Sequence, residues 1–127
     1  MLDHLGIRVS DFGRSNAFYK KALAPLSITV IKELTPADTG ADGHTGFGRD
    51  GKAFFWIGDG DNPSRSVHIA FSASSRAVVE AFYRAALEAG GKDNGAPGLR
   101  PQYHANYFGA FVLDPDGNNV EAVWRGP

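Results

Sequence analysis

Three residues far apart in the chain, His4, His68 and Glu121, carry side chains that could together bind a metal ion. Two imidazoles and one carboxylate form a facial ligand set, which leaves coordination positions open for water or substrate. All three side chains are available at neutral pH once the histidines have given up their protons. The residue types therefore predict one divalent ion, of zinc, nickel, manganese or iron, that would polarise a bound small molecule.

The two histidines open two copies of one sequence pattern. His4 and His68 lie 64 positions apart (68 minus 4), and the similar segments 17–23 and 81–87 have the same offset (81 minus 17). A repeat that runs without a gap through a strand and the following helix indicates one supersecondary unit used twice. If the two units pack about a pseudo-twofold axis, the two histidines face each other.

Each copy has the pattern of a β-α-β-β-β unit. Apolar alternation predicts strands, and Asp11 and then Ser74 or Ser75 are typical helix N-caps. The predicted strands cover residues 3–10, 27–34, 46–49, 53–57, 67–72, 107–113 and 119–124, with a loop at 35–45 and an irregular strand or loop at 93–101. The predicted fold is α+β: two β-α-β-β-β modules form a cupped, mostly antiparallel eight-stranded sheet, with one helix outside each module.

The length of 127 residues predicts a single domain, with modules at 1–58 and 67–127 and a linker at 59–66. The net charge is −1 and the basic residues are scattered, so nucleic acid is not expected as a partner. No apolar stretch approaches the ~18 residues of a membrane span, and no signal peptide is evident. The absence of cysteine rules out thiolate ligands and fits a cytoplasmic protein.

Glu121 lies in an apolar strand, where a carboxylate without a partner is costly. When the turns Asp50-Gly51 and Asp116-Gly117 are aligned, the counterpart of Glu121 in the first module is Phe55. The second copy thus has an acid where the first has an aromatic ring. This asymmetry supports a ligand role for Glu121, although pairing with an arginine such as Arg8 is an alternative.

The chain resembles the vicinal oxygen chelate superfamily, which includes glyoxalase I, extradiol dioxygenases, and bleomycin- and fosfomycin-resistance proteins. The similar segments are 4–11, the helix with Phe18-Tyr19, and 114–121. The resemblance implies paired modules around a divalent metal, with His4, His68 and Glu121 at three of the four ligand positions. Phe55 stands at the fourth, where similar bacterial glyoxalases have a carboxylate, which weighs against glyoxalase I activity.

Further side chains could bind or act on a substrate. His104 lies in an aromatic cluster and is a candidate general acid–base, and Glu121 falls where glyoxalases keep a proton-shuttling glutamate. The predicted walls of the pocket are Phe47, Phe55, Trp56, Tyr103, Tyr107 and Phe108.

Two main functions and one weaker possibility remain open. The first is a metal-dependent glyoxalase- or dioxygenase-like enzyme, acting as an isomerase, lyase or dioxygenase on a small substrate whose adjacent oxygens chelate the ion. The alternative is a metal-independent binding protein that sequesters a planar ligand, as bleomycin-resistance proteins do; a structural dimer module is a weaker possibility. The resemblance implies a homodimer, in which His4 could meet His68 of its own chain or of the partner.

Overall fold

The computed structural model describes residues 1–40 and 42–127, and it contains two copies of one β-α-β-β-β arrangement. The first module consists of β1 (Leu5–Val9), α1 (Phe12–Leu23), β2 (Thr29–Leu34), β3 (His44–Arg49) and β4 (Lys52–Asp59). The second consists of β5 (His68–Ser72), α3 (Arg76–Glu88), β6 (Lys92–Leu99), β7 (Phe108–Leu113) and β8 (Asn119–Trp124). The predicted α+β, two-module fold is confirmed.

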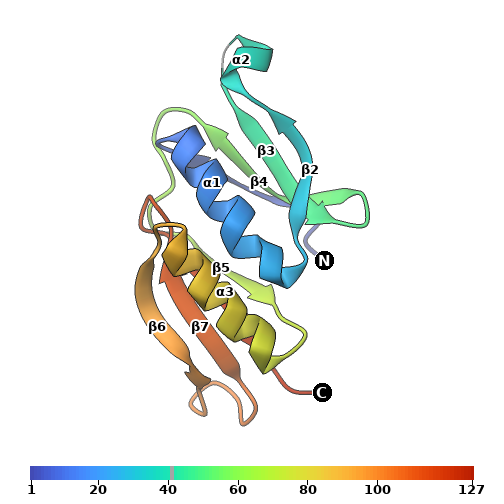
Figure 1. Ribbon diagram of the computed structural model, residues 1–127, viewed down its shortest axis with the longest axis vertical. Coiled ribbons are helices and arrows are strands. Elements are labelled where there is room, and N and C mark those ends of the chain that lie inside the picture. Colours follow the sequence, from blue (N-terminus) through green and yellow to red (C-terminus); the bar gives the residue numbers. More distant parts are fainter. Residues whose placement is uncertain (41) are drawn as a thin grey trace.

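The eight strands form two separate four-stranded sheets, with the orders β1-β4-β3-β2 and β5-β8-β7-β6. In each sheet the first pair is parallel and the other pairs are antiparallel. Helices α1 and α3 lie next to each other over the same side of the two sheets (Figure 1). The opposite faces of β4 and β8 are therefore free to line cavities.

The local signals in the sequence account for both helices. The Asp11 side chain accepts a hydrogen bond from the Arg14 backbone N–H and begins α1, and Ser75 caps α3 in the same way. The predicted loop at 35–45 is partly wrong, because a capping box between Thr35 and Asp38 begins the short helix α2 (Pro36–Thr39). Residue 41 of that segment lies outside the described residues. A 3-10 turn, η1 (Ala24–Leu26), follows α1.

The strand register corrects the alignment of the two modules by one residue. Gly6 pairs with Trp56, and its repeat equivalent Ala70 pairs with Glu121, so Trp56 is the counterpart of Glu121. The two hairpins differ in length, and the register of β3 and β4 shifts between residues 47 and 48, so their turns are a poor guide to register. Since a one-residue slip reverses the face of a strand, Phe55 points into the core, where it is 1% exposed.

The turn between β7 and β8 joins the two modules through polar contacts, one of them buried and one partly buried. The Tyr19 hydroxyl of α1 donates to Asp114 at 2.5 Å, and the Ser10 hydroxyl donates to Asp116 at 2.5 Å. Beside them the Phe55 and Phe71 rings meet edge to face, with their centroids 5.5 Å apart. These contacts fix the relative position of the sheets. None of the helices in the described part of the chain is long and apolar enough to span a membrane.

The buried Tyr19 predicts a loss of stability at alkaline pH. Burial, together with the nearby Asp114 carboxylate, raises the pKa of Tyr19 well above its ordinary value. Because the folded-state pKa is higher than the unfolded one, the stabilisation is complete below the unfolded pKa of about 10 and falls at higher pH. Urea unfolding at about pH 9 and about pH 11 should show a smaller loss in Tyr19→Phe than in the wild type. Equal losses in the two proteins would contradict this prediction.

Candidate functional site

Glu121 is a carboxylate held inside the second module. It lies in the middle of β8, between Ala70 of β5 and Phe111 of β7, and it is 1% exposed. It points away from α3, because Val120 and Ala122 on either side of it belong to the hydrophobic core. A charged group in this position needs partners, since its desolvation is otherwise costly.

Two side chains share the Glu121 carboxylate. His68 Nε2 lies 2.8 Å from Glu121 Oε1, and the Tyr107 hydroxyl donates a hydrogen bond to Oε2. The side chain of His68 is 55% exposed, so it contacts both the buried carboxylate and the solvent. The sequence-based prediction thus named two residues, His68 and Glu121, that the fold brings into direct contact.

Tyr107 is fixed on the cavity side of the sheet. Burial, and then the hydrogen bond to Glu121, raise the pKa of Tyr107 to about 12, so its hydroxyl remains a neutral donor at physiological pH. The Tyr103 ring packs against it at 5.2 Å between centroids, and the Arg125 guanidinium lies 5.0 Å from its centroid. Gly109 makes room for this arrangement, because a Cβ there would lie 3.2 Å from Tyr107 Cε1 and 3.3 Å from Glu121 Oε2.

These side chains line a cavity of about 360 Å³, which we call the module-2 cavity; its lining residues are His68, Tyr103, Tyr107, Phe111, Glu121 and Arg125. Tyr107, just before β7, and Phe111, within it, lie on the same face of that strand. Glu121, within β8, and Arg125, just after it, likewise lie on one face. Sequence reasoning missed Arg125. The signal was the spacing of four residues from Glu121, because residues that far apart in an extended chain lie on the same face.

His4 lies apart from this pair within the chain. It precedes β1, its side chain is 60% exposed, and its Nδ1 lies 2.7 Å from Asp3 Oδ1. Among residues 1–40 and 42–127, no group of three or more His, Cys, Asp or Glu side chains is close enough to hold one ion. A single chain therefore brings together two of the three predicted ligands.

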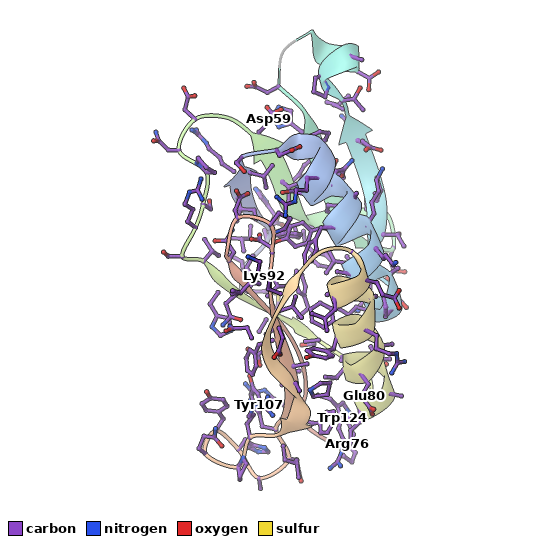
Figure 2. The ribbon with its side chains drawn as sticks, turned by 60° about the vertical axis from the view of Figure 1, so that its left-hand side comes forward. Asp59, Arg76, Glu80, Lys92, Tyr107 and Trp124 are labelled. Carbon is purple, nitrogen blue, oxygen red and sulfur yellow. The ribbon has the colours of Figure 1, made fainter. Side chains whose placement is uncertain are left out.

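The other predicted site residues occupy several environments. Tyr103 and Tyr107 line the module-2 cavity, whereas Phe47 and Phe55 are buried in the core against Tyr19. Phe108 also belongs to the core, on the helix side of its sheet, under the Arg76 guanidinium at 4.9 Å. In Figure 2, Tyr107 lies beside the strands, while Arg76 and Trp124 lie toward α3. Strand alternation separates Phe108 from Tyr107, its neighbour in the chain.

His104 is exposed in the turn before β7 and does not line the module-2 cavity. Its Nδ1 accepts a hydrogen bond from the Asn106 backbone N–H at 3.1 Å, so one ring nitrogen is occupied by the turn itself. The side chain stabilises the loop that carries Tyr103 and Asn106. A contact with substrate would have to use the other nitrogen.

A second cavity of about 540 Å³, the module-1 cavity, lies on the corresponding face of the first sheet and includes Arg8, His44 and Trp56 in its lining. The indole ring of Trp56 covers Gly46, where a Cβ would lie 2.7 Å from the ring. Arg8 donates through Nη1 to the Asp61 carbonyl at 3.0 Å. The alternative pairing of Arg8 with Glu121 is therefore wrong, because Glu121 is bound by His68 and Tyr107.

The module-2 cavity contains two donors, one nitrogen and one oxygen, of types that bind divalent cations. Glu121 Oε1 and His68 Nε2 already converge, and Tyr107 occupies the second carboxylate oxygen, so Oε1 alone faces the imidazole. Nitrogen and oxygen donors of this kind bind zinc, nickel, manganese and iron. A hydrogen bond from an outer residue to a ligating carboxylate is a common feature of such sites.

Comparison with known proteins gives a consistent picture. Residues 1–122 match the family model described as Glyoxalase/Bleomycin resistance protein/Dioxygenase superfamily. A solved structure of a glyoxalase/bleomycin resistance protein from Albidiferax ferrireducens superposes with a TM-score of 0.76 at 23% identity, over 98% of each chain. No match was found among curated proteins.

Two further solved structures are similar to this chain. Glyoxalase I from Zea mays gives a TM-score of 0.70 at 26% identity; the match covers 98% of this chain but 46% of the maize chain, so this chain spans about half its length. A mutant of the fosfomycin resistance protein FosX from Listeria monocytogenes, complexed with Mn(II) and 1S,2S-dihydroxypropylphosphonic acid, gives 0.68 at 18% identity, over 97% and 88% of the two chains.

Proposed function

This chain belongs to the glyoxalase/bleomycin resistance protein/dioxygenase superfamily, and we propose that it is a metal-dependent enzyme of the glyoxalase- or dioxygenase-like kind. Its substrate is a small molecule with adjacent oxygen atoms, and its reaction is an isomerisation, a lyase reaction or a dioxygenation. One observation carries the proposal: a carboxylate that is 1% exposed contacts an imidazole in a cavity of about 360 Å³. A fold gains little stability from such a buried acid, so its presence favours a functional role.

His68 Nε2 and Glu121 Oε1 would hold the ion in this proposal. When bound, a divalent ion supplies Lewis-acid polarisation of the substrate oxygens. The support from this chain is the convergence of the two donors and the Tyr107 hydrogen bond that fixes the carboxylate. The Mn(II) bound in the similar FosX structure is consistent with this choice of ion.

We propose that His4 of a second copy completes the ligand set in a homodimer. His4 is 60% exposed and lies outside the module-2 cavity of its own chain, so it is accessible to another molecule. The imidazole and carboxylate of one copy would then be joined by an imidazole of the other. This arrangement places the Trp56 side of one copy opposite the Glu121 side of its partner.

The remaining residues of the cavity bind and orient the substrate. Tyr103, Tyr107 and Phe111 present aromatic surface that excludes water from bound substrate. Glu121 Oε1 would accept a proton from the substrate, and the neutral Tyr107 hydroxyl would keep Oε2 in place.

Mixing two defective variants tests the shared site. His4→Ala and Glu121→Gln should each bind less Mn²⁺ than the wild type, because each lacks one ligand. If the site spans two copies, a mixture that has exchanged subunits should regain one intact site per heterodimer. Metal content after gel filtration with Mn²⁺, measured by mass spectrometry, reports the recovery. No recovery in subunit-exchanged samples would overturn the shared site, and a wild type that binds neither Mn²⁺, Zn²⁺, Ni²⁺ nor Fe²⁺ would overturn the enzyme proposal.

The module-1 cavity favours a second candidate, a metal-independent protein that binds a planar ligand. Trp56 and His44 lie in its lining, and aromatic rings bind planar molecules by stacking. Tryptophan fluorescence of metal-free protein would detect such a ligand in a screen. Saturable binding that survives His4→Ala and His68→Ala would favour this candidate over the enzyme.

A further inference from the structure

We propose that Arg125 binds an oxyanion, such as a carboxylate, on the far side of the substrate from its chelating oxygens. The substrate class is then a small vicinal-oxygen compound that carries a negative charge. This inference rests on the proposed function, because it extends the same cavity. It adds a second recognition point to the His68–Glu121 pair.

The chain around Arg125 places its backbone beside the module-2 cavity. Arg125 directly follows β8 and shares the cavity face with Glu121, four residues earlier. After it the chain turns at Gly126, whose φ is +89°, a conformation that favours glycine. Gly126 packs closely on Asn106, since a Cβ there would lie 3.1 Å from Asn106 Cβ. Arg125 is exposed, so it lines the cavity at its solvent side, next to the loop before β7.

No carboxylate in the described part of the chain neutralises the charge of Arg125. Within residues 1–40 and 42–127, no ion pair joins its guanidinium to a carboxylate; its contact is with the face of the Tyr107 ring, at 5.0 Å. Arg100 differs, because its guanidinium donates to the Ala96 and Leu99 carbonyls. A cavity-lining guanidinium without an acceptor is suited to bind one from a ligand, because its donors match a carboxylate in geometry.

The cavity brings the acid and the guanidinium to one tyrosine ring. The Tyr107 hydroxyl contacts Glu121, and the Arg125 guanidinium lies over the face of the same ring, 5.0 Å from its centroid. A substrate that chelates an ion at His68 and Glu121 would reach Arg125 by extending past that ring. With a divalent ion bound beside one carboxylate and one guanidinium, the cavity carries net positive charge, which favours an anion.

Two small probes test this geometry on the Mn²⁺-loaded protein. Catechol offers adjacent oxygens alone, and 3,4-dihydroxybenzoate adds a carboxylate across the ring. Isothermal titration should show that the wild type binds 3,4-dihydroxybenzoate about tenfold more tightly than catechol, a preference that shrinks in high salt. Arg125→Gln should lose the preference while keeping its affinity for catechol, and Arg125→Lys should keep part of the preference.

Arg76→Gln is the matched control. Arg76 makes the same kind of contact, with the Phe108 ring at 4.9 Å, on the helix side of the sheet, so its removal should leave the preference intact. If the wild type binds both probes equally, or if Arg125→Gln keeps the preference, the inference about Arg125 is overturned while the metal site stands. If neither probe binds and Mn²⁺ is not retained, the proposed function fails and this inference fails with it.

Discussion

Asp114→Ala is expected to lower the free energy of unfolding by about 4 kcal/mol. The Asp114 carboxylate is 4% exposed and accepts hydrogen bonds from the Tyr19 hydroxyl, the Asp116 and Asn118 backbone N–H groups, and Asn118 Nδ2. Alanine would leave these donors buried without an acceptor, and each such loss costs about 1–3 kcal/mol. Urea unfolding followed by circular dichroism measures the change.

Two further variants separate the causes. Asp114→Asn keeps an acceptor for the turn but brings an amide N–H₂ against Asn118 or Tyr19, so about half of the full loss is expected. Asp61→Ala replaces an exposed aspartate in the segment between the modules, and its effect should stay within about 0.5 kcal/mol. A small effect of Asp114→Ala would mean that the β7–β8 turn does not hold α1 in place.

The duplicated sequence pattern is a strong guide to this fold because it depends on local signals. The offset shared by His4 and His68 predicts two equivalent strands, and the cap residue Asp11 predicts the start of a helix. Register depends on tertiary pairing instead. The alignment of turns therefore gives Phe55 as the residue of the first module equivalent to Glu121, whereas the parallel strand pairing gives Trp56.

The candidate site shows the same division between local and tertiary information. A carboxylate inside an apolar strand singles out Glu121 from the sequence alone. The hydrogen bond from Tyr107 could not be predicted, because it depends on the absence of a side chain at Gly109 and on the strand pairing that brings β7 beside β8. The position of His4 relative to Glu121 also lies beyond local signals, because it depends on how the two modules pack.

The two modules carry different residues at equivalent positions, and this difference gives their cavities different side chains. Glu121 faces its cavity with a charged oxygen, whereas Trp56 at the equivalent position faces the other cavity with an indole. In the proposed function, the second sheet would supply ligands for a cation, and the first would supply an aromatic ring. Duplication followed by such exchange would allow one half to bind the ion and the other to bind the body of a substrate.

Glu121→Gln is expected to reduce Mn²⁺ affinity by at least about 100-fold. The amide removes the negative charge that would face the ion but keeps the size of the side chain, and loss of a ligand should exceed the roughly 10–100-fold effect of an outer residue. Tyr107→Phe should reduce affinity by about tenfold, because Oε2 loses the hydrogen bond that orients the carboxylate. Competition with a chelating dye measures both affinities.

Two controls distinguish a loss of Mn²⁺ affinity from misfolding: the stability of Glu121→Gln and the Mn²⁺ affinity of a variant at a distant tyrosine. Glu121→Gln removes a buried charge, so the metal-free variant should unfold within about 1 kcal/mol of the wild type or be more stable. Tyr83→Phe removes a hydroxyl bonded to Asp93, away from the module-2 cavity, and should bind Mn²⁺ as the wild type does. Wild-type affinity in both Glu121→Gln and Tyr107→Phe would show that the buried carboxylate serves the fold, because an ion held elsewhere would not respond to either change.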